Sequence, residues 1–151
     1  MEKIIKTLEE LEEEVTSFIH SLIPSRQRAT LVTLAGELGA GKTAFVKAVS
    51  RALGITEVVN SPTFVLEKIY QLGGETPKFV RLVHIDAYRL ESGADLTPLG
   101  FDELMRDKRN LILLEWPGEV TDALPEPAVK IFLIANPDGS RIISYTYEQR
   151  L

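Results

Sequence analysis

Residues 36–43 read Gly-Glu-Leu-Gly-Ala-Gly-Lys-Thr and match the pattern G-x-x-x-x-G-K-[ST] at every defined position. The β-branched and aliphatic run Thr30–Ala35 comes directly before this stretch and predicts a buried strand. An apolar-rich segment ending at Gly54 follows it and predicts a helix. A glycine-rich turn between a strand and a helix directs backbone amides and the positive end of the helix toward an anion. The sequence therefore predicts a loop that binds the phosphates of a nucleotide.

Two side chains of this loop carry specific chemistry. We expect Lys42 to bridge the β- and γ-phosphates and the Thr43 hydroxyl to bind magnesium. Glycine at positions 39 and 41 leaves space where a side chain would collide with the ligand. A glycine-containing turn with a chance lysine is the alternative, and the flanking strand and helix argue against it. The candidate nucleotide-binding residues are Gly36, Glu37, Leu38, Gly39, Ala40, Gly41, Lys42 and Thr43.

Two carboxylates stand at the ends of further predicted strands. Glu115 follows four aliphatic residues, and Asp86 ends the predicted strand at residues 78–86. A magnesium site beside the loop needs carboxylates at such positions, although a strand-end carboxylate can also simply cap a loop. We favour Glu115 as the metal ligand, direct or through water, and Asp86 as the group that orients water or the metal shell. The reverse assignment stays open.

Three further features lie near these positions in the sequence. The tripeptide Ser61-Pro62-Thr63 follows the predicted helix, and Pro62 favours an extended Ser61. Such a loop either offers a threonine hydroxyl to the metal and γ-phosphate or is a plain turn. His84 is expected to be a packed or hydrogen-bonded histidine rather than a catalytic base. Trp116, the only tryptophan, follows a strand end, which favours the rim of the site or a partner surface.

The remaining segments predict two helices, a strand and a hairpin. Thr7 and Glu10 form a predicted capping box before a helix whose apolar stripe is Leu8, Leu11, Val15, Phe18, Ile19 and Leu22. Residues 95–108 predict a short helix with an uncertain start, because they include Pro98 and Gly100. Residues 63–70 resemble a strand. Val129–Ala135 and Arg141–Tyr147 predict a hairpin around Asn136-Pro137-Asp138-Gly139.

Composition narrows the classes of protein that remain. The 151 residues fit one domain, residues 1–151, with an ordinary hydrophobic core. Without cysteine there is no thiol nucleophile, thiolate zinc site or disulfide. The net charge of −5 argues against a broad nucleic-acid footprint. No apolar run is long enough for a membrane span and no signal sequence is evident, so we expect a cytoplasmic protein without a membrane partner.

Four motifs in this order resemble the TsaE family, formerly YjeE, of small P-loop ATPases in bacterial tRNA threonylcarbamoyladenosine biosynthesis. The first is the loop at residues 36–43. The others are Ser-Pro-Thr-Phe at 61–64, His-Ile-Asp-Ala-Tyr-Arg-Leu at 84–90 and Glu-Trp-Pro at 115–117. The resemblance covers nearly the whole chain. It implies an α/β, three-layer P-loop NTPase-like fold with a mixed central sheet.

The resemblance also implies an activity and its partners. It implies binding of ATP and Mg²⁺, with ATP hydrolysis that is weak until the chain docks on TsaB and TsaD. Hydrolysis would then support multi-turnover modification, with tRNA reached only indirectly and no metabolite substrate besides the nucleotide. The implied catalytic residues are Lys42, Thr63, Asp86 and Glu115; the implied metal ligands are Thr43, Asp86 and Glu115; and the implied nucleotide-binding set adds Thr7, Ser61, Pro62, Thr63, Trp116 and Arg141 to residues 36–43.

Two other functions use the same loop. One is a small-molecule kinase, although 151 residues leave little room for a substrate-binding insertion and an arginine-bearing lid. The other is a regulatory interaction module that binds nucleotide without significant hydrolysis. The choice of ATP over GTP comes from the resemblance, and the absence of an Asn-Lys-x-Asp motif agrees with it.

Overall fold

The computed structural model describes residues 1–55, 67–73 and 78–148. Within this part of the chain the strands form one seven-stranded sheet in the order β1-β7-β6-β2-β5-β4-β3. The strands are β1 (Glu2–Ile5), β2 (Thr30–Ala35), β3 (Glu67–Gln71), β4 (Arg81–Asp86), β5 (Asn110–Glu115), β6 (Val129–Ala135) and β7 (Arg141–Tyr147). The predicted strands at residues 63–70 and 78–86 are observed in their C-terminal parts, and residues 63–66 lie outside the described residues.

The sheet is mixed, with parallel strands at its centre. Strand β2 pairs in parallel with β5 and β6, and β5 pairs in parallel with β4. The outer pairs, β6 with β7, β7 with β1 and β4 with β3, are antiparallel. All six residues of β5 are buried, as expected for a parallel strand covered on both faces. The carboxyl ends of β2, β4 and β5 therefore meet at one edge of the sheet.

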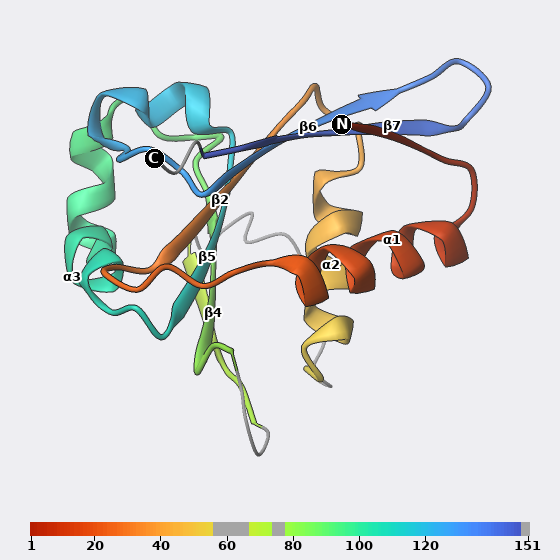
Figure 1. Cartoon of the computed structure of the whole chain (residues 1–151). Coiled ribbons are helices and arrows are strands. Elements are labelled where there is room, and N and C mark those ends of the chain that lie inside the picture. The colour runs from red at the N-terminus through yellow and green to blue at the C-terminus, as the bar shows by residue number, and fades with distance from the viewer. Residues whose placement is uncertain (56–66, 74–77, 149–151) are drawn as a thin grey trace.

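Helices cover both faces of the sheet, which gives three layers (Figure 1). Helices α1 (Leu8–Ser21) and α2 (Lys42–Ala52) lie on one side, and α3 (Phe101–Arg106) lies on the other with two 3₁₀-helices, η1 (Gly93–Leu99) and η2 (Pro117–Ala123). Adjacent residues of β2 divide between the two cores, because Val32 packs with Phe18 and Phe45 while Leu31 packs with Phe101. The predicted three-layer α/β fold is confirmed. None of the helices in the described ranges is long and apolar enough to cross a membrane.

The start of α1 differs in two details from the prediction. The Thr7 hydroxyl accepts a hydrogen bond from the Glu10 amide at 3.1 Å, as a capping box requires. The Glu10 carboxylate, however, accepts from the Lys6 amide at 2.7 Å rather than from that of Thr7. Leu8 is 59% exposed, so it is wrong as a core position. The buried side of the helix is formed by residues further along it, Val15, Phe18 and Ile19.

The predicted helix at residues 95–108 is two shorter elements. Gly100 adopts a left-handed conformation with φ 72°, which ends η1 and starts α3. A continuous helix cannot pass through that conformation, which glycine adopts without steric cost. The start of η1 is fixed instead by a capping box between Ser92 and Asp95. The change of direction brings the apolar side chains of both short helices onto the same core.

Lys78 caps the C-terminal end of α1 from a distant part of the chain. Its ammonium donates hydrogen bonds to the carbonyl oxygens of Ile19 (2.9 Å), His20 (2.6 Å) and Leu22 (3.1 Å). These carbonyls lie at the C-terminal end of α1, which is the negative end of its dipole, and the Ile19 carbonyl also accepts from the Leu22 amide at 3.3 Å. We expect Lys78→Met to lower the free energy of unfolding by about 1–2 kcal/mol in a urea titration, with Lys108→Met as the control at an exposed lysine. An equal effect of both variants would contradict this role for Lys78.

Candidate nucleotide site

The loop between β2 and α2 has a backbone that only glycine adopts easily. Gly36, Gly39 and Gly41 have φ values of 144°, 80° and 106°. These values fall in a region that L side chains rarely occupy. Gly41 also immediately precedes α2 and supplies no side-chain cap to its first amides. The first turn of an 11-residue helix thus directs amide hydrogens to the loop, where an anion would satisfy them.

Gly36 is additionally constrained by its neighbours. A Cβ atom at this position would lie 2.5 Å from the carbonyl oxygen of Leu133 and 3.2 Å from the Cβ of Ala40. Because the first clash is with backbone, it is relieved only by moving β6 or the loop. We expect Gly36→Ala to lower the melting temperature and weaken nucleotide affinity at least about tenfold, because backbone strain costs about 1–3 kcal/mol. Gly54→Ala is the control, since it shares a positive φ of 84° but meets no atom within 4 Å.

Lys42 is buried inside the loop. Its side-chain ammonium donates hydrogen bonds to the carbonyl oxygens of Gly36 (2.5 Å) and Glu37 (2.9 Å). It also lies 4.1 Å from the centre of the Trp116 ring, within range of a cation–π contact. Burial lowers the pKa of Lys42, and the negative charges of Glu115 and Asp86 oppose that shift. The ammonium of Lys42 therefore contacts the loop carbonyls and interacts electrostatically with the two carboxylates.

The two predicted carboxylates are brought together by strand register. Asp86 pairs with Glu115 at the ends of the neighbouring parallel strands β4 and β5. Glu115 is 2% exposed, and its carboxylate lies 2.6 Å from the Nε2 atom of His84. Asp86 is partly exposed and accepts a hydrogen bond from the Tyr88 amide at 3.0 Å. His84 is thus hydrogen-bonded, as predicted, but its partner is one of the two candidate site carboxylates.

A magnesium ion at this position would use few protein ligands. The described residues hold no group of three or more His, Cys, Asp and Glu side chains arranged for a metal. Mg²⁺ commonly uses one or two carboxylates together with phosphate oxygens and water. Thr43 in the first turn of α2, with Asp86 and Glu115, supplies oxygen donors of that type. The residues present therefore fit the sequence-predicted ion, and their individual roles stay predictions.

Trp116 occupies an unusual backbone position beside Lys42. Its φ of 60° is the only positive value at a non-glycine residue in the described part of the chain. Its amide donates to the Leu34 carbonyl at 3.1 Å, which fixes it at the end of β2. The centre of its ring lies 4.9 Å from the centre of the Tyr88 ring. Tyr88 was not among the site residues predicted from the sequence. Backbone strain of this kind is concentrated at functional sites, so Trp116 and Tyr88 belong to the candidate site.

Thr7 and Arg141 lie beside the loop although both are remote from it in sequence. Together with Gly41 and Ala44 they line a cavity of about 230 Å³. A Cβ on Gly41 would lie 3.5 Å from the Nε atom of Arg141, which shows how closely the guanidinium approaches the loop. Their predicted role in nucleotide binding remains a prediction. The predicted switch residues Ser61, Pro62 and Thr63 lie outside the described residues.

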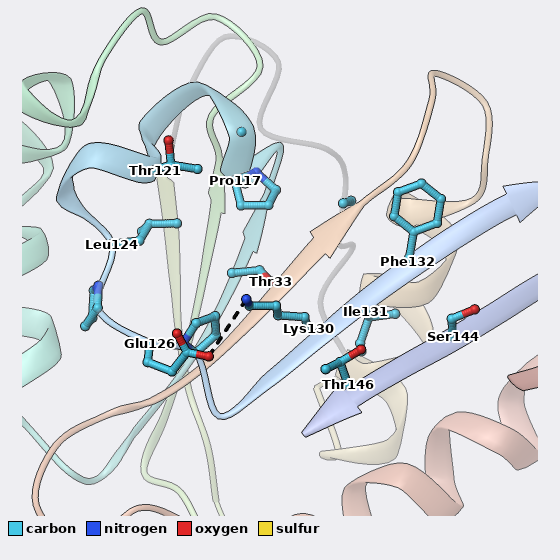
Figure 2. A pocket seen from close by; sticks show the side chains of 14 residues that line it. Thr33, Pro117, Thr121, Leu124, Glu126, Lys130, Ile131, Phe132, Ser144 and Thr146 are labelled. Carbon is cyan, nitrogen blue, oxygen red and sulfur yellow. Dashed lines mark ion pairs between the residues drawn. The ribbon is translucent and has the colours of Figure 1, made fainter. Parts of the chain in front are cut away.

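A groove larger than the cavity beside Thr7 and Arg141, with a volume of about 560 Å³, is lined by residues of η2, β6 and neighbouring segments (Figure 2). Pro117, Thr121 and Leu124 line it from η2 and the following loop, and Phe132 lines it from β6. Its labelled charged residues, Lys130 and Glu126, form an ion pair with each other at 3.8 Å. The lining does not include Lys42, Asp86 or Glu115. The groups suited to phosphate and metal chemistry are therefore those at the β2–α2 loop.

Comparison with known proteins places the chain in a family. Residues 9–143 match the family described as "Threonylcarbamoyl adenosine biosynthesis protein TsaE". The chain is similar to the tRNA threonylcarbamoyladenosine biosynthesis proteins TsaE of Treponema pallidum and Rickettsia bellii. The first is 39% identical over 78% of this chain and 82% of the relative. The second is 32% identical over 95% of both chains.

A relative from Bacillus subtilis with the same description is 38% identical over 77% of this chain and 68% of its own length. The fold is similar to the crystal structure of Bacillus subtilis YdiB, with a TM-score of 0.75 and 27% identity. That match covers 97% of this chain and 84% of the other. Motifs, fold and relatives agree: the chain belongs to the TsaE family.

Proposed function

We propose that the chain is the ATP-hydrolysing component of a complex that makes threonylcarbamoyladenosine in tRNA, acting as one P-loop ATPase domain over residues 1–151. Family membership supports the pathway. The observation that supports the hydrolytic activity is the position of Lys42 at an uncapped helix start, where its ammonium contacts the carbonyls of Gly36 and Glu37 and interacts electrostatically with Asp86 and Glu115. A lysine, a hydroxyl and strand-end carboxylates are the groups that phosphoryl transfer to water requires.

Each group has a proposed role. The loop amides and Lys42 bind the β- and γ-phosphates of ATP. Thr43 and Glu115, directly or through water, hold Mg²⁺, and Asp86 orients water or the metal shell. Magnesium at this position neutralises charge that develops on the phosphate oxygens. Thr63 is proposed to complete the site with Ser61 and Pro62, as the switch loop.

The cavity beside Thr7 and Arg141 adjoins the same loop. Its lining includes Gly41 and Ala44 at the start of α2, so it lies next to the loop proposed to bind the phosphates. We assign it to the nucleoside part of ATP. The Arg141 guanidinium supplies hydrogen-bond donors there. The Trp116 ring lies 4.1 Å from the Lys42 ammonium.

The proposed partners are TsaB and TsaD, in the cytoplasm. Their docking would raise a weak basal hydrolysis, and tRNA would be reached only through the complex. This fits a chain with a net charge of −5, which does not favour broad phosphate-backbone contacts of its own.

A phosphate-release assay with and without the TsaB–TsaD pair tests the proposal. We expect slow Mg²⁺-dependent release from ATP by the chain alone and a clear increase with both partners. Transfer of labelled γ-phosphate to a metabolite instead of water would identify a small-molecule kinase. Nucleotide binding with no release under either condition would identify a regulatory interaction module.

Fluorescence of the single tryptophan provides a second measurement. Trp116 is partly buried, and its ring contacts both Lys42 and Tyr88. When phosphates draw Lys42 toward them, the environment of the indole changes, so we expect ATP with Mg²⁺ to shift or quench the emission. Lys42→Ala should remove most of that response. An emission spectrum unaffected by saturating ATP and by TsaB–TsaD would place Trp116 away from both binding events.

A further inference from the structure

His84 is the polar residue within an otherwise aliphatic, fully buried stretch of β4. Leu82, Val83 and Ile85 are each 0% exposed, and so is His84. Burying an imidazole costs desolvation free energy that an aliphatic side chain would not. Among the described residues, the hydrogen bond that offsets this cost joins its Nε2 atom to the Oε2 atom of Glu115 at 2.6 Å.

The chemistry of the pair fixes the direction of the hydrogen bond. A carboxylate only accepts, so the Nε2 atom carries the proton and donates. The other ring nitrogen, Nδ1, is buried and has no hydrogen-bond partner in the described part of the chain. The ring is therefore oriented by packing and by Glu115, and its hydrogen-bonding capacity is directed at the candidate site.

The strand register explains how this contact reaches the site. His84 pairs with Leu113, and Asp86 pairs with Glu115 two residues further along both strands. Side chains two residues apart share a face of the sheet. His84 therefore lies on the same face as Asp86 and Glu115, two positions before them along the paired strands. Glu115 itself is 2% exposed, and its charge acts on Lys42. The imidazole therefore forms its hydrogen bond with one oxygen of Glu115 on the face of the sheet that the two side chains share.

We propose that His84 is a positioning residue that fixes the Glu115 carboxylate for the magnesium and nucleotide site. The proposal rests on the function proposed above. It assigns His84 no contact with ATP and no proton transfer. Its effect is to restrict Glu115 to one rotamer, so that the second carboxylate oxygen is available in a fixed direction. Hydrogen-bond partners of metal-ligand side chains commonly change metal affinity or activity about 10–100-fold when they are removed.

Two substitutions separate positioning from packing. His84→Leu keeps an apolar side chain in the core but removes the donor. His84→Gln places an amide N–H close to where the imidazole Nε2 lies and retains a donor. We expect His84→Leu to lower kcat for MgATP about 10–100-fold and to raise the half-saturating Mg²⁺ concentration, and His84→Gln to recover most of both. Affinity for ATP in EDTA should change less than about threefold, because the loop and Lys42 stay intact.

A double-substitution cycle with Glu115→Gln tests whether His84 acts through Glu115. If it does, adding His84→Leu to Glu115→Gln should cause little further loss of kcat, whereas independent effects would multiply. Tyr145→Phe is the control for loss of a partly buried hydrogen bond, because the Tyr145 hydroxyl on β7 donates to Glu14 of α1 at 3.0 Å. It should leave kcat and the Mg²⁺ requirement unchanged.

Imidazole ¹⁵N NMR supplies a readout that does not depend on hydrolysis. The sequence has two histidines, and the exposed His20 serves as the reference for a free ring. We expect a protonated Nε2 with slow hydrogen exchange at His84, and faster exchange in Glu115→Gln. Exchange at His84 as fast as at His20, full activity of His84→Leu, or multiplicative losses in the double variant would each overturn the proposal. A wild-type chain that neither binds nor hydrolyses MgATP would overturn the proposed function and this inference with it.

Discussion

Replacing Lys42 by alanine is expected to reduce ATP affinity at least about 100-fold and to abolish hydrolysis, because charged hydrogen bonds contribute about 1.5–3 kcal/mol each and 1.4 kcal/mol is a factor of ten. In the structure the ammonium already lies inside the loop on the carbonyls of Gly36 and Glu37. Titration with a fluorescent ATP analogue and a phosphate-release assay measure the two effects.

The matched control is Lys130→Ala. Lys130 lies on β6 in the larger groove, where its side chain is 56% exposed and pairs with Glu126. Loss of that exposed charge should leave nucleotide affinity unchanged. If Lys42→Ala bound ATP as tightly as the wild-type chain, while circular dichroism showed it to be folded, the phosphate-binding assignment would be wrong.

Replacing Glu115 by glutamine should separate binding from hydrolysis. We expect kcat to fall about 100- to 1000-fold, the usual effect of removing a group that stabilises transition-state charge, while ATP affinity without magnesium changes little. Glutamine keeps the shape of the side chain in a site where only 2% of the residue is exposed. The loss would then reflect the missing charge rather than a cavity.

Asp86→Asn provides the comparison that decides between the two carboxylates. If Glu115 is the metal ligand, Glu115→Gln should raise the Mg²⁺ requirement more than Asp86→Asn does, and the opposite ranking would exchange their roles. Glu119→Gln is the control at an exposed carboxylate of η2. Unchanged partner-stimulated turnover and tRNA modification in both site variants would rule out the hydrolytic function and favour a binding-only module.

Local patterns were sufficient where neighbouring residues determine the structure. The loop at residues 36–43 could be predicted because its glycines, lysine and threonine lie within eight consecutive residues and its strand and helix adjoin it. The aliphatic run of β5 and the hairpin of β6 and β7 were predictable for the same reason. The helix predicted at residues 95–108 contains α3, but the break at Gly100 was not predicted, because the left-handed conformation of Gly100 competes with a helical pattern that continues on both sides of it.

The conformation of the loop at residues 36–43 was determined by the local sequence, because the backbone there follows from the order of glycines within one short segment. The tertiary structure decided which distant groups surround it. His84 and Glu115 are 31 residues apart and meet only through the register of β4 and β5. Arg141 reaches Gly41, and the Trp116 ring reaches Lys42, only after the sheet is assembled. Strand order and register depend on packing across the whole sheet, which no local pattern specifies.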